Sequence, residues 1–216
     1  MKHWLIVWSA AWFVGLPLLF YYLGDVPART VLKEAISLTT LLAFSLMLGQ
    51  FYLARSNMRV IELFDLRRVK KLHTVIAYSA VTALLLHPLA IVVPRYFEAG
   101  VDPLEAFTTM ITTVQTPGIF FGLIAWVLLA VLTVTSFFRF RVIRALHISY
   151  PHWRHFHGML GIMLTVFAVL HAILLGRHMI VPMRVFVIVT AVIGAVMLLR
   201  MYRPRHHVEA SVPARQ

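Results

Sequence analysis

The sequence predicts an all-α polytopic membrane protein built as a bundle of six transmembrane helices. Of its 216 residues, 61% are hydrophobic and only 13% are charged, which is far from the composition of a soluble domain. Uncharged stretches recur along the whole chain, and each approaches or exceeds the roughly 20 residues that a helix needs to cross a bilayer. A signal peptide would explain one such stretch at most.

Reading between the charged residues places the helices at 3–24, 35–54, 72–94, 106–136 and beyond, 155–176 and 179–199. In the fourth stretch, the motif QTPG at 115–118 indicates the helix entry, because proline is favoured in a first turn. The sixth is the weakest, since Arg184 interrupts it, although an arginine near a helix end can extend to the membrane surface. We expect one transmembrane domain at 1–200 and a short basic tail at 201–216.

The net charge of +12 is unevenly divided between the two sides of this topology. Fifteen of the 20 Lys and Arg lie at the N-terminus, in the second and fourth connections, or after the sixth helix, whereas the other side holds five of the eight acidic residues. Cytoplasmic loops carry an excess of Lys and Arg, so both termini are predicted to be cytoplasmic. The charge is expected to anchor the chain to anionic lipid and not to bind nucleic acid.

Cysteine is absent from the sequence. Disulfides and thiolate metal sites are therefore excluded, and any cofactor must be held by other ligands.

Two of the predicted helices carry histidine pairs with the same spacing: His73 and His87 in the third, His157 and His171 in the fifth. At about 100° per residue, fourteen steps come within about 40° of four full turns, so each pair lies on one helix face. The rise is about 21 Å at about 1.5 Å per residue. Because the two helices run in the same direction, His73 is expected to face His157 on the cytoplasmic side, and His87 to face His171 on the outer side.

Two stacked bis-histidine sites of this kind suit two haem b groups held between the third and fifth helices. Neutral imidazoles bind haem iron axially, whereas zinc prefers about four protein ligands at one point. A single histidine in a membrane helix is often a hydrogen-bonded packing residue. Four at matched depths favour ligation, since polar residues in the bilayer are costly and usually functional. We therefore interpret 1–200 as a haem-binding domain.

The other histidines are weaker candidates. His152 and His155 lie on other faces of the fifth helix than His171, and His178 is an alternative outer ligand at the helix end. The remaining ones are expected to be solvated: His3, His147, His206 and His207.

Basic side chains near each site could pair with haem propionates, although ordinary topology or snorkelling charge is the alternative for every one. The inner candidates are Arg67, Arg68, Lys71 and Arg154, and the outer ones are Arg95 and Arg177. Trp153 and Tyr150 are predicted to be membrane-interface aromatics rather than electron relays.

The segments LRRVKKLHTVIAYSAVTALLLHPL and YPHWRHFHGMLGIMLTVFAVLHAILLG resemble the two haem-binding helices of the ferric reductase-like transmembrane domain. This family includes NADPH oxidases, ferric reductases and the membrane subunit of bacterial methionine sulfoxide reductase systems. The likeness covers residues 35–200. It implies that His73, His87, His157 and His171 are the haem ligands, and that the protein is an oxidoreductase component, multi-pass in a bacterial cytoplasmic (inner) membrane.

The sequence departs from the larger family members after the sixth helix. The tail MYRPRHHVEASVPARQ contains neither a Gly-rich phosphate loop nor room for a βαβ unit, so it is not expected to bind a dinucleotide. A cytoplasmic flavin reductase or reduced flavin is therefore the expected electron donor, with an acceptor on the outer side. Whether flavin itself binds is left open.

Two other functions fit the same sequence. One is a di-haem cytochrome b subunit that exchanges electrons with quinone, because such proteins have similar histidine spacing. The other is a haem-free transporter or scaffold that uses the histidines for protons or metal; the absence of convincing inverted repeats makes a transporter less favoured.

Overall fold

The computed structural model describes residues 1–202, and this part of the chain contains helices and no strand. Six helical segments are long and apolar enough to cross a membrane, which confirms the predicted multi-pass helical fold. They are Lys2–Leu23 (α1 Lys2–Ala10, η1 Ala11–Gly15 and α2 Leu16–Leu23), α3 (Val31–Gly49), α5 (Leu66–Ala99), α7 (Pro117–Phe137), α9 (Tyr150–Leu175) and α10 (Val181–Tyr202). The predicted tail lies almost wholly outside the described residues.

Three short helices occupy the connections: α4 (Met58–Phe64), α6 (Pro103–Thr112) and α8 (Arg139–Ala145). The apolar stretch that begins at residue 106 divides in two. Its first part belongs to α6, and the membrane helix α7 begins at Pro117, which confirms the entry predicted at the QTPG motif. A local cap explains α6. The Asp102 carboxylate accepts hydrogen bonds from the backbone N–H groups of Leu104 at 2.8 Å and Glu105 at 3.0 Å, and Pro103 suits a first turn.

The helix α5 is longer than the predicted 72–94, with 34 residues. It begins after Asp65, whose carboxylate accepts from the backbone N–H of Arg67, and ends at Gly100, which has the left-handed φ of 65° typical of a helix C-terminus. Its ends are therefore set by capping residues beyond the apolar stretch.

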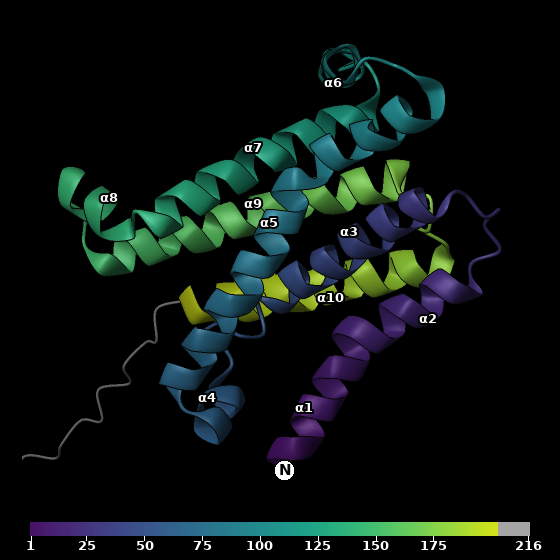
Figure 1. Cartoon of the computed structure of the whole chain (residues 1–216). Helices are drawn as coiled ribbons and strands as arrows, with labels where there is room; N and C mark the ends of the chain where they lie inside the picture. The colour runs from purple at the N-terminus through teal and green to yellow at the C-terminus, as the bar shows by residue number, and fades with distance from the viewer. Residues whose placement is uncertain (203–216) are drawn as a thin grey trace, which may run out of the picture.

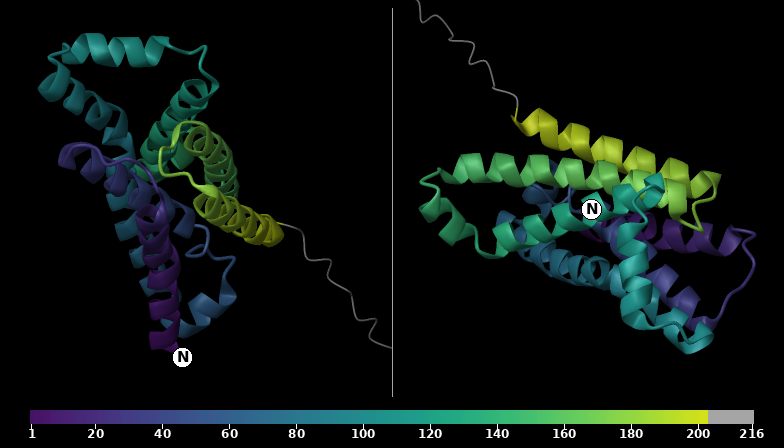
Figure 2. Two further views of the ribbon diagram at one scale, coloured as in Figure 1. Left: turned by 90° about the vertical axis from the view of Figure 1, so that its right-hand side faces the viewer. Right: turned by 90° about the horizontal axis from the view of Figure 1, so that it is seen from above.

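The long helices form two closely packed pairs, α7 with α9 and α3 with α5, while α10 contacts both α9 and α3. Figure 1 shows α5 running obliquely across the bundle, and Figure 2 shows α9 and α10 side by side. α6 lies across the end of the bundle, because it is seen end-on where α7 is seen lengthwise. Within residues 1–202, α5 and α9 do not pack closely against each other. The two helices that carry the histidine pairs thus have different main neighbours, α3 for α5 and α7 for α9.

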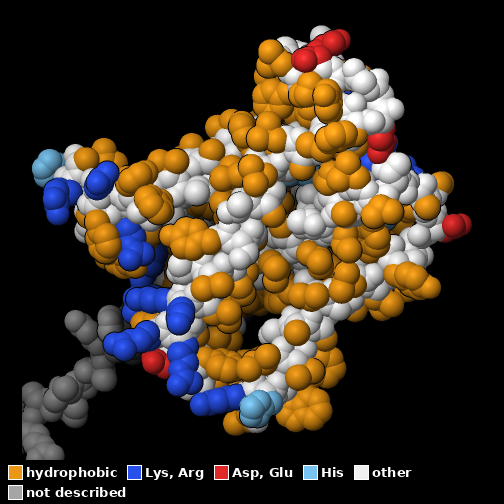
Figure 3. Space-filling view, viewed as in Figure 1, with side chains coloured by type: hydrophobic (Ala, Val, Ile, Leu, Met, Phe, Trp, Pro, Cys, Tyr) orange, Lys and Arg blue, Asp and Glu red, His pale blue; other side chains and the backbone are white. Residues whose placement is uncertain are grey.

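Fully buried side chains of α3 and α10 pack at the centre of the bundle, among them Leu48, Met183 and Val187. Buried Thr190 accepts a hydrogen bond from the Trp12 indole at 3.1 Å. Large apolar side chains also cover much of the outer surface (Figure 3). Apolar patches of this extent are unusual for a soluble monomer and are expected of a surface that faces lipid.

Charged side chains gather at the two ends of the bundle. Lys and Arg lie mostly at the end that carries α4 and α8, whereas Asp and Glu lie mostly at the end that carries α6 (Figure 3). The charge asymmetry of the sequence is therefore an asymmetry between the two ends of the helices.

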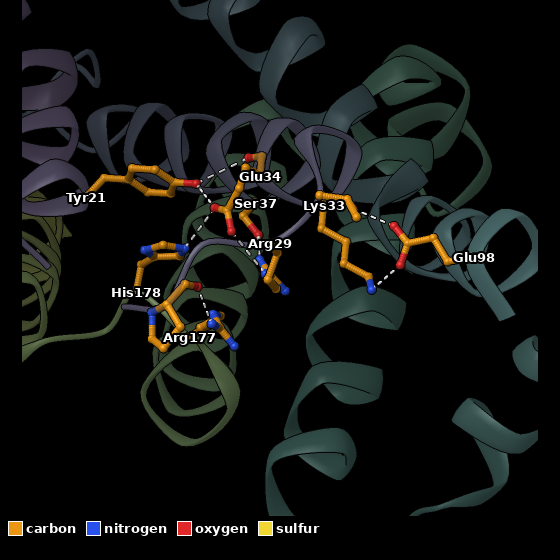
Figure 4. A network of polar contacts seen from close by, with 10 residues as sticks. Tyr21, Arg29, Lys33, Glu34, Ser37, Glu98, Arg177 and His178 are labelled. Carbon is orange, nitrogen blue, oxygen red and sulfur yellow. Dashed lines mark hydrogen bonds and ion pairs between the residues drawn. The ribbon is translucent and has the colours of Figure 1, made fainter. Parts of the chain in front are cut away.

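A polar network joins four segments at the acidic end (Figure 4). The carboxylate of Glu34 accepts hydrogen bonds from the Tyr21 hydroxyl and, at 3.1 Å, from Arg29. Nε2 of His178 lies 3.3 Å from the same carboxylate, without the alignment of a hydrogen bond, and its ring stacks on Tyr21 at 4.0 Å. Lys33 pairs with Glu98 at the end of α5. These contacts tie α2 and the α9–α10 connection to the start of α3.

The stability of this network is expected to fall at acidic pH. Burial lowers the pKa of His178 below its ordinary value, with a further lowering from Arg29 and Arg177 and a partial offset from Glu34. The unfolded chain therefore takes up this proton at higher pH than the folded chain, so the free energy of unfolding decreases as pH drops below about 6.5.

The check is the thermal midpoint in detergent between about pH 8 and about pH 5. His178→Phe keeps a ring against Tyr21 and is expected to flatten the acid side of the profile, whereas exposed His3→Gln is expected to leave it unchanged. An equally steep acid decline in His178→Phe would show that this ring is not responsible.

Candidate functional site

The four predicted histidines lie in two pairs at two levels of the bundle. α5 and α9 both begin at the basic end and run toward the acidic end (Figure 1), so their first histidines, His73 and His157, share one level and their second histidines the other. All four are partly buried. The structure brings together the pairs that the sequence predicts.

The pair nearer the acidic end consists of His87 and His171. Their ring centroids lie 6.4 Å apart with the planes at 78°. Imidazole nitrogens bind metals at about 2 Å, so two imidazoles on opposite sides of one metal ion have ring centres roughly 6 Å apart. The separation fits a metal ion between the rings.

The pair nearer the basic end, His73 and His157, lines a cavity of about 780 Å³ between α3, α5, α7, α9 and α10. Cofactor sites typically enclose about 300–1,000 Å³. The walls are mainly apolar, from residues such as Val81, Leu129 and Leu164. Gly161 also faces the cavity, and a Cβ there would meet no atom within 4 Å. The space suits a large, flat, mostly apolar ligand.

Three of the four histidines have a partner for Nδ1 on a neighbouring helix. Nδ1 of His87 lies 3.0 Å from the Thr40 hydroxyl, Nδ1 of His157 lies 3.0 Å from the Ser136 hydroxyl, and Nδ1 of His171 lies 2.8 Å from the Gly118 carbonyl. His73 differs. It lies beside the backbone of Gln50, yet its buried Nδ1 forms no hydrogen bond within residues 1–202. Metal-binding histidines usually donate the N–H of their second ring nitrogen to a hydrogen-bond partner, and His87, His157 and His171 each have such a partner.

Two further buried donors in the cavity wall, Nε1 of Trp153 and Nε of Arg154, also lack a partner in the described part of the chain. Buried donors are rarely left unpaired. Two adjacent unpaired donors suit a ligand that carries an acceptor such as a carboxylate. With the histidines and the apolar walls, they fit haem, whose propionates are carboxylates.

The prediction that Trp153 is a membrane-interface aromatic is wrong. Its side chain is only 6% exposed, and its ring stacks on His157 at 5.2 Å and 26°. Tyr150, which is 44% exposed, stacks on the Trp153 ring in turn. Trp153 therefore supports the orientation of a candidate ligand.

The predicted basic residues are placed differently from one another. Lys71 and Arg154 line the cavity, while Arg67 and Arg68 are exposed at the start of α5 and do not. At the acidic end, Arg95 is exposed, and Arg177 donates to the Pro27 carbonyl. Three basic residues at the cavity were not predicted as site residues: Arg55, Lys70 and Arg139. They belong to the same basic connections, but the sequence does not show which of those residues turn inward.

The remaining histidines lie elsewhere. His178 belongs to the Glu34 network and its ring stacks on Tyr21, contacts that give no support to it as an alternative outer ligand. The side chains of His3, His147, His152 and His155 are exposed. His206 and His207 lie outside the described residues. Within residues 1–202, no three His, Cys, Asp or Glu side chains come together in a way that could hold a metal ion.

Comparison with known proteins connects this geometry to a family. Residues 39–148 match the model of the ferric reductase like transmembrane component family. The matched range contains α5 with His73 and His87, and ends before α9. An uncharacterized protein of Archaeoglobus fulgidus is 36% identical over 163 residues, which cover 76% of this chain and 86% of that protein. No solved structure matches the chain.

Proposed function

Because the chain belongs to the ferric reductase-like transmembrane family, we propose that it carries electrons across a membrane by means of two haem b groups. His73 and His157 hold one group, and His87 and His171 hold the other. The observation that supports this most strongly is the arrangement of two histidine pairs on helices that do not pack closely against each other within residues 1–202.

Bound haem would supply one-electron redox chemistry. The chain supplies the ligands, their orientation and an apolar surrounding. At the inner site, Trp153 and Arg154 offer unpaired donors to the propionates, and Lys71 adds positive charge. The contribution of Arg67, Arg68, Arg95 and Arg177 to propionate binding stays a prediction.

The proposed direction of transfer rests on the charge asymmetry between the two ends of the bundle and on a cytoplasmic donor. We place the basic end and both termini in the cytoplasm of a bacterial cell, since Lys and Arg are enriched in cytoplasmic loops. A cytoplasmic flavin reductase or reduced flavin gives electrons to the site of His73 and His157. An acceptor outside the membrane takes them from the site of His87 and His171. In this proposal the protein is the membrane component of an oxidoreductase, and a separate reductase is its partner.

Spectroscopy of the purified protein tests the proposal. We expect a b-type spectrum on reduction and about two haems per chain. In sealed vesicles with reduced flavin on the basic side, we expect an electron acceptor trapped on the other side to be reduced. A stably folded protein without haem would overturn the proposal. Haem reduction by quinol but not by reduced flavin would favour the cytochrome b function instead.

A further inference from the structure

We infer that the hydroxyl groups of Thr40 and Ser136 position the candidate ligands His87 and His157 by accepting the Nδ1 proton of each ring, which leaves Nε2 free to bind metal. The two residues act through the histidines and lie on other helices, α3 and α7. This inference rests on the proposed haem sites and adds to them two positioning residues.

At Ser136, the direction of the hydrogen bond follows from the geometry. The hydroxyl donates to the Leu132 carbonyl at 2.6 Å, and its oxygen lies 3.0 Å from Nδ1 of His157. A carbonyl can only accept, and a serine hydroxyl has a single hydrogen. We assign that hydrogen to Leu132, whose carbonyl is the nearer acceptor, so that the oxygen accepts from Nδ1 of His157. The proton of this ring is therefore on Nδ1, and the lone pair is on Nε2.

The same logic holds at Thr40. Its hydroxyl donates to the Ile36 carbonyl at 2.8 Å, and its oxygen lies 3.0 Å from Nδ1 of His87. The single hydrogen of the Thr40 hydroxyl is again assigned to a carbonyl, which cannot donate, so the hydroxyl oxygen is left to accept. Nδ1 of His87 is thereby the donor, with the lone pair on Nε2.

Donation to a carbonyl four residues earlier is common for Ser and Thr in helices and by itself says nothing about a site. Several residues of the described chain do so, including Thr74, Ser79, Thr133 and Thr135. Among all Ser and Thr residues of 1–202 that donate to a carbonyl four residues earlier, only Thr40 and Ser136 also contact a histidine nitrogen. The two exceptions contact one candidate ligand in each pair.

The other two candidate ligands, His171 and His73, differ in whether Nδ1 has a partner. Nδ1 of His171 faces the Gly118 carbonyl at 2.8 Å, a backbone acceptor that no side-chain substitution removes. His73 has no such partner within residues 1–202. Ser136 is thus the one hydroxyl partner in the inner pair, and Thr40 is the replaceable partner in the outer pair.

Removing an acceptor from Nδ1–H weakens both the orientation and the basicity of the ligand, and typically costs about 10- to 100-fold in metal affinity. We expect Ser136→Ala to lower haem affinity by this factor at the inner site alone and to raise the midpoint potential of that haem, because a less basic ligand stabilises ferric iron less. Thr40→Val, which has nearly the shape of threonine, is expected to do the same at the outer site alone.

Conservative substitutions that keep a hydroxyl group at each position serve as the rescue experiment. Ser136→Thr and Thr40→Ser keep the acceptor oxygen and are expected to restore wild-type potentials and haem retention. Thr135→Val is the matched control on α7, because Thr135 bonds only to backbone carbonyls among the described residues, and exposed Thr39→Val is the control on α3.

The readouts are a redox titration of the two haem components and haem retention during dilution, with each component assigned by the histidine variant that removes the other. The role is overturned if Ser136→Ala and Thr40→Val match their controls while the wild type holds two haems, a result that leaves the proposed function intact. A haem-free wild type overturns both. Should Ser136→Ala not fold, Ser136→Cys, which provides only a weak acceptor, must show the same inner-site loss.

Discussion

Replacing His171 by alanine is expected to leave the purified protein with one haem per chain instead of two and to abolish electron transfer across the membrane. The ring of His171 faces His87 at 6.4 Å, and removing it leaves the outer site with one histidine. His87→Ala is expected to give the same result. Since His73 and His157 are one level away, their site keeps its ligands, and its spectrum should persist.

The reciprocal variants, His73→Ala and His157→Ala, are expected to remove the inner haem and leave the outer one. Haem per chain and the reduced spectrum measure the loss, and vesicle experiments measure transfer. His155→Ala and His178→Ala are the controls, because His155 is exposed and His178 belongs to the Glu34 network. Loss of both haems in His178→Ala, or of neither in His171→Ala, would contradict this assignment of ligands.

A methyl group at Gly122 is expected to remove most haem from the outer site although both ligand residues are unchanged. A Cβ there would overlap Nδ1 of His171 and lie 2.7 Å from Cε1 of the same ring. The ring would have to turn away and give up its 2.8 Å contact with the Gly118 carbonyl. We expect Gly122→Ala to lower outer haem affinity by about 10- to 100-fold, the usual cost of a disturbed ligand partner.

Gly161→Ala, at the inner cavity, is the matched control, because a Cβ at that position meets nothing within 4 Å. It is expected to retain both haems. The larger Gly161→Leu enters the inner cavity and is expected to reduce inner haem binding alone. The comparison uses the same haem and spectral measurements, and outer haem retention in Gly122→Ala equal to that in Gly161→Ala would exclude the steric argument.

The sequence predicted the membrane helices well and their ends poorly, for a physical reason. Hydropathy reports which residues suit lipid, whereas a helix continues until a cap or a left-handed residue stops it. The third helix therefore reaches Asp65 and Gly100, beyond the predicted 72–94. The short α6 was not predicted, although the Asp102 and Pro103 pair is a readable start signal.

At the candidate site, helical periodicity was enough to predict which histidines share a face and which pairs meet. Their partners were not predictable in the same way. Thr40, Ser136 and Gly118 lie 47, 21 and 53 residues from the histidines they contact, and such contacts depend on how the helices pack. The burial of Trp153 has the same origin, since an aromatic residue near a helix end is equally suited to a membrane interface.

The unequal lengths of the two histidine-bearing helices make the thickness of the bilayer matter to both sites. With 34 residues, α5 is about 51 Å long at about 1.5 Å per residue, whereas the hydrocarbon layer is about 30 Å thick. The 26 residues of α9 give about 39 Å. A long helix accommodates a thinner or thicker membrane by changing its tilt, and α5 is not fastened closely to α9 within the described chain. A change in the tilt of α5 would move His73 and His87 relative to His157 and His171, so we expect lipid chain length to affect both sites at once.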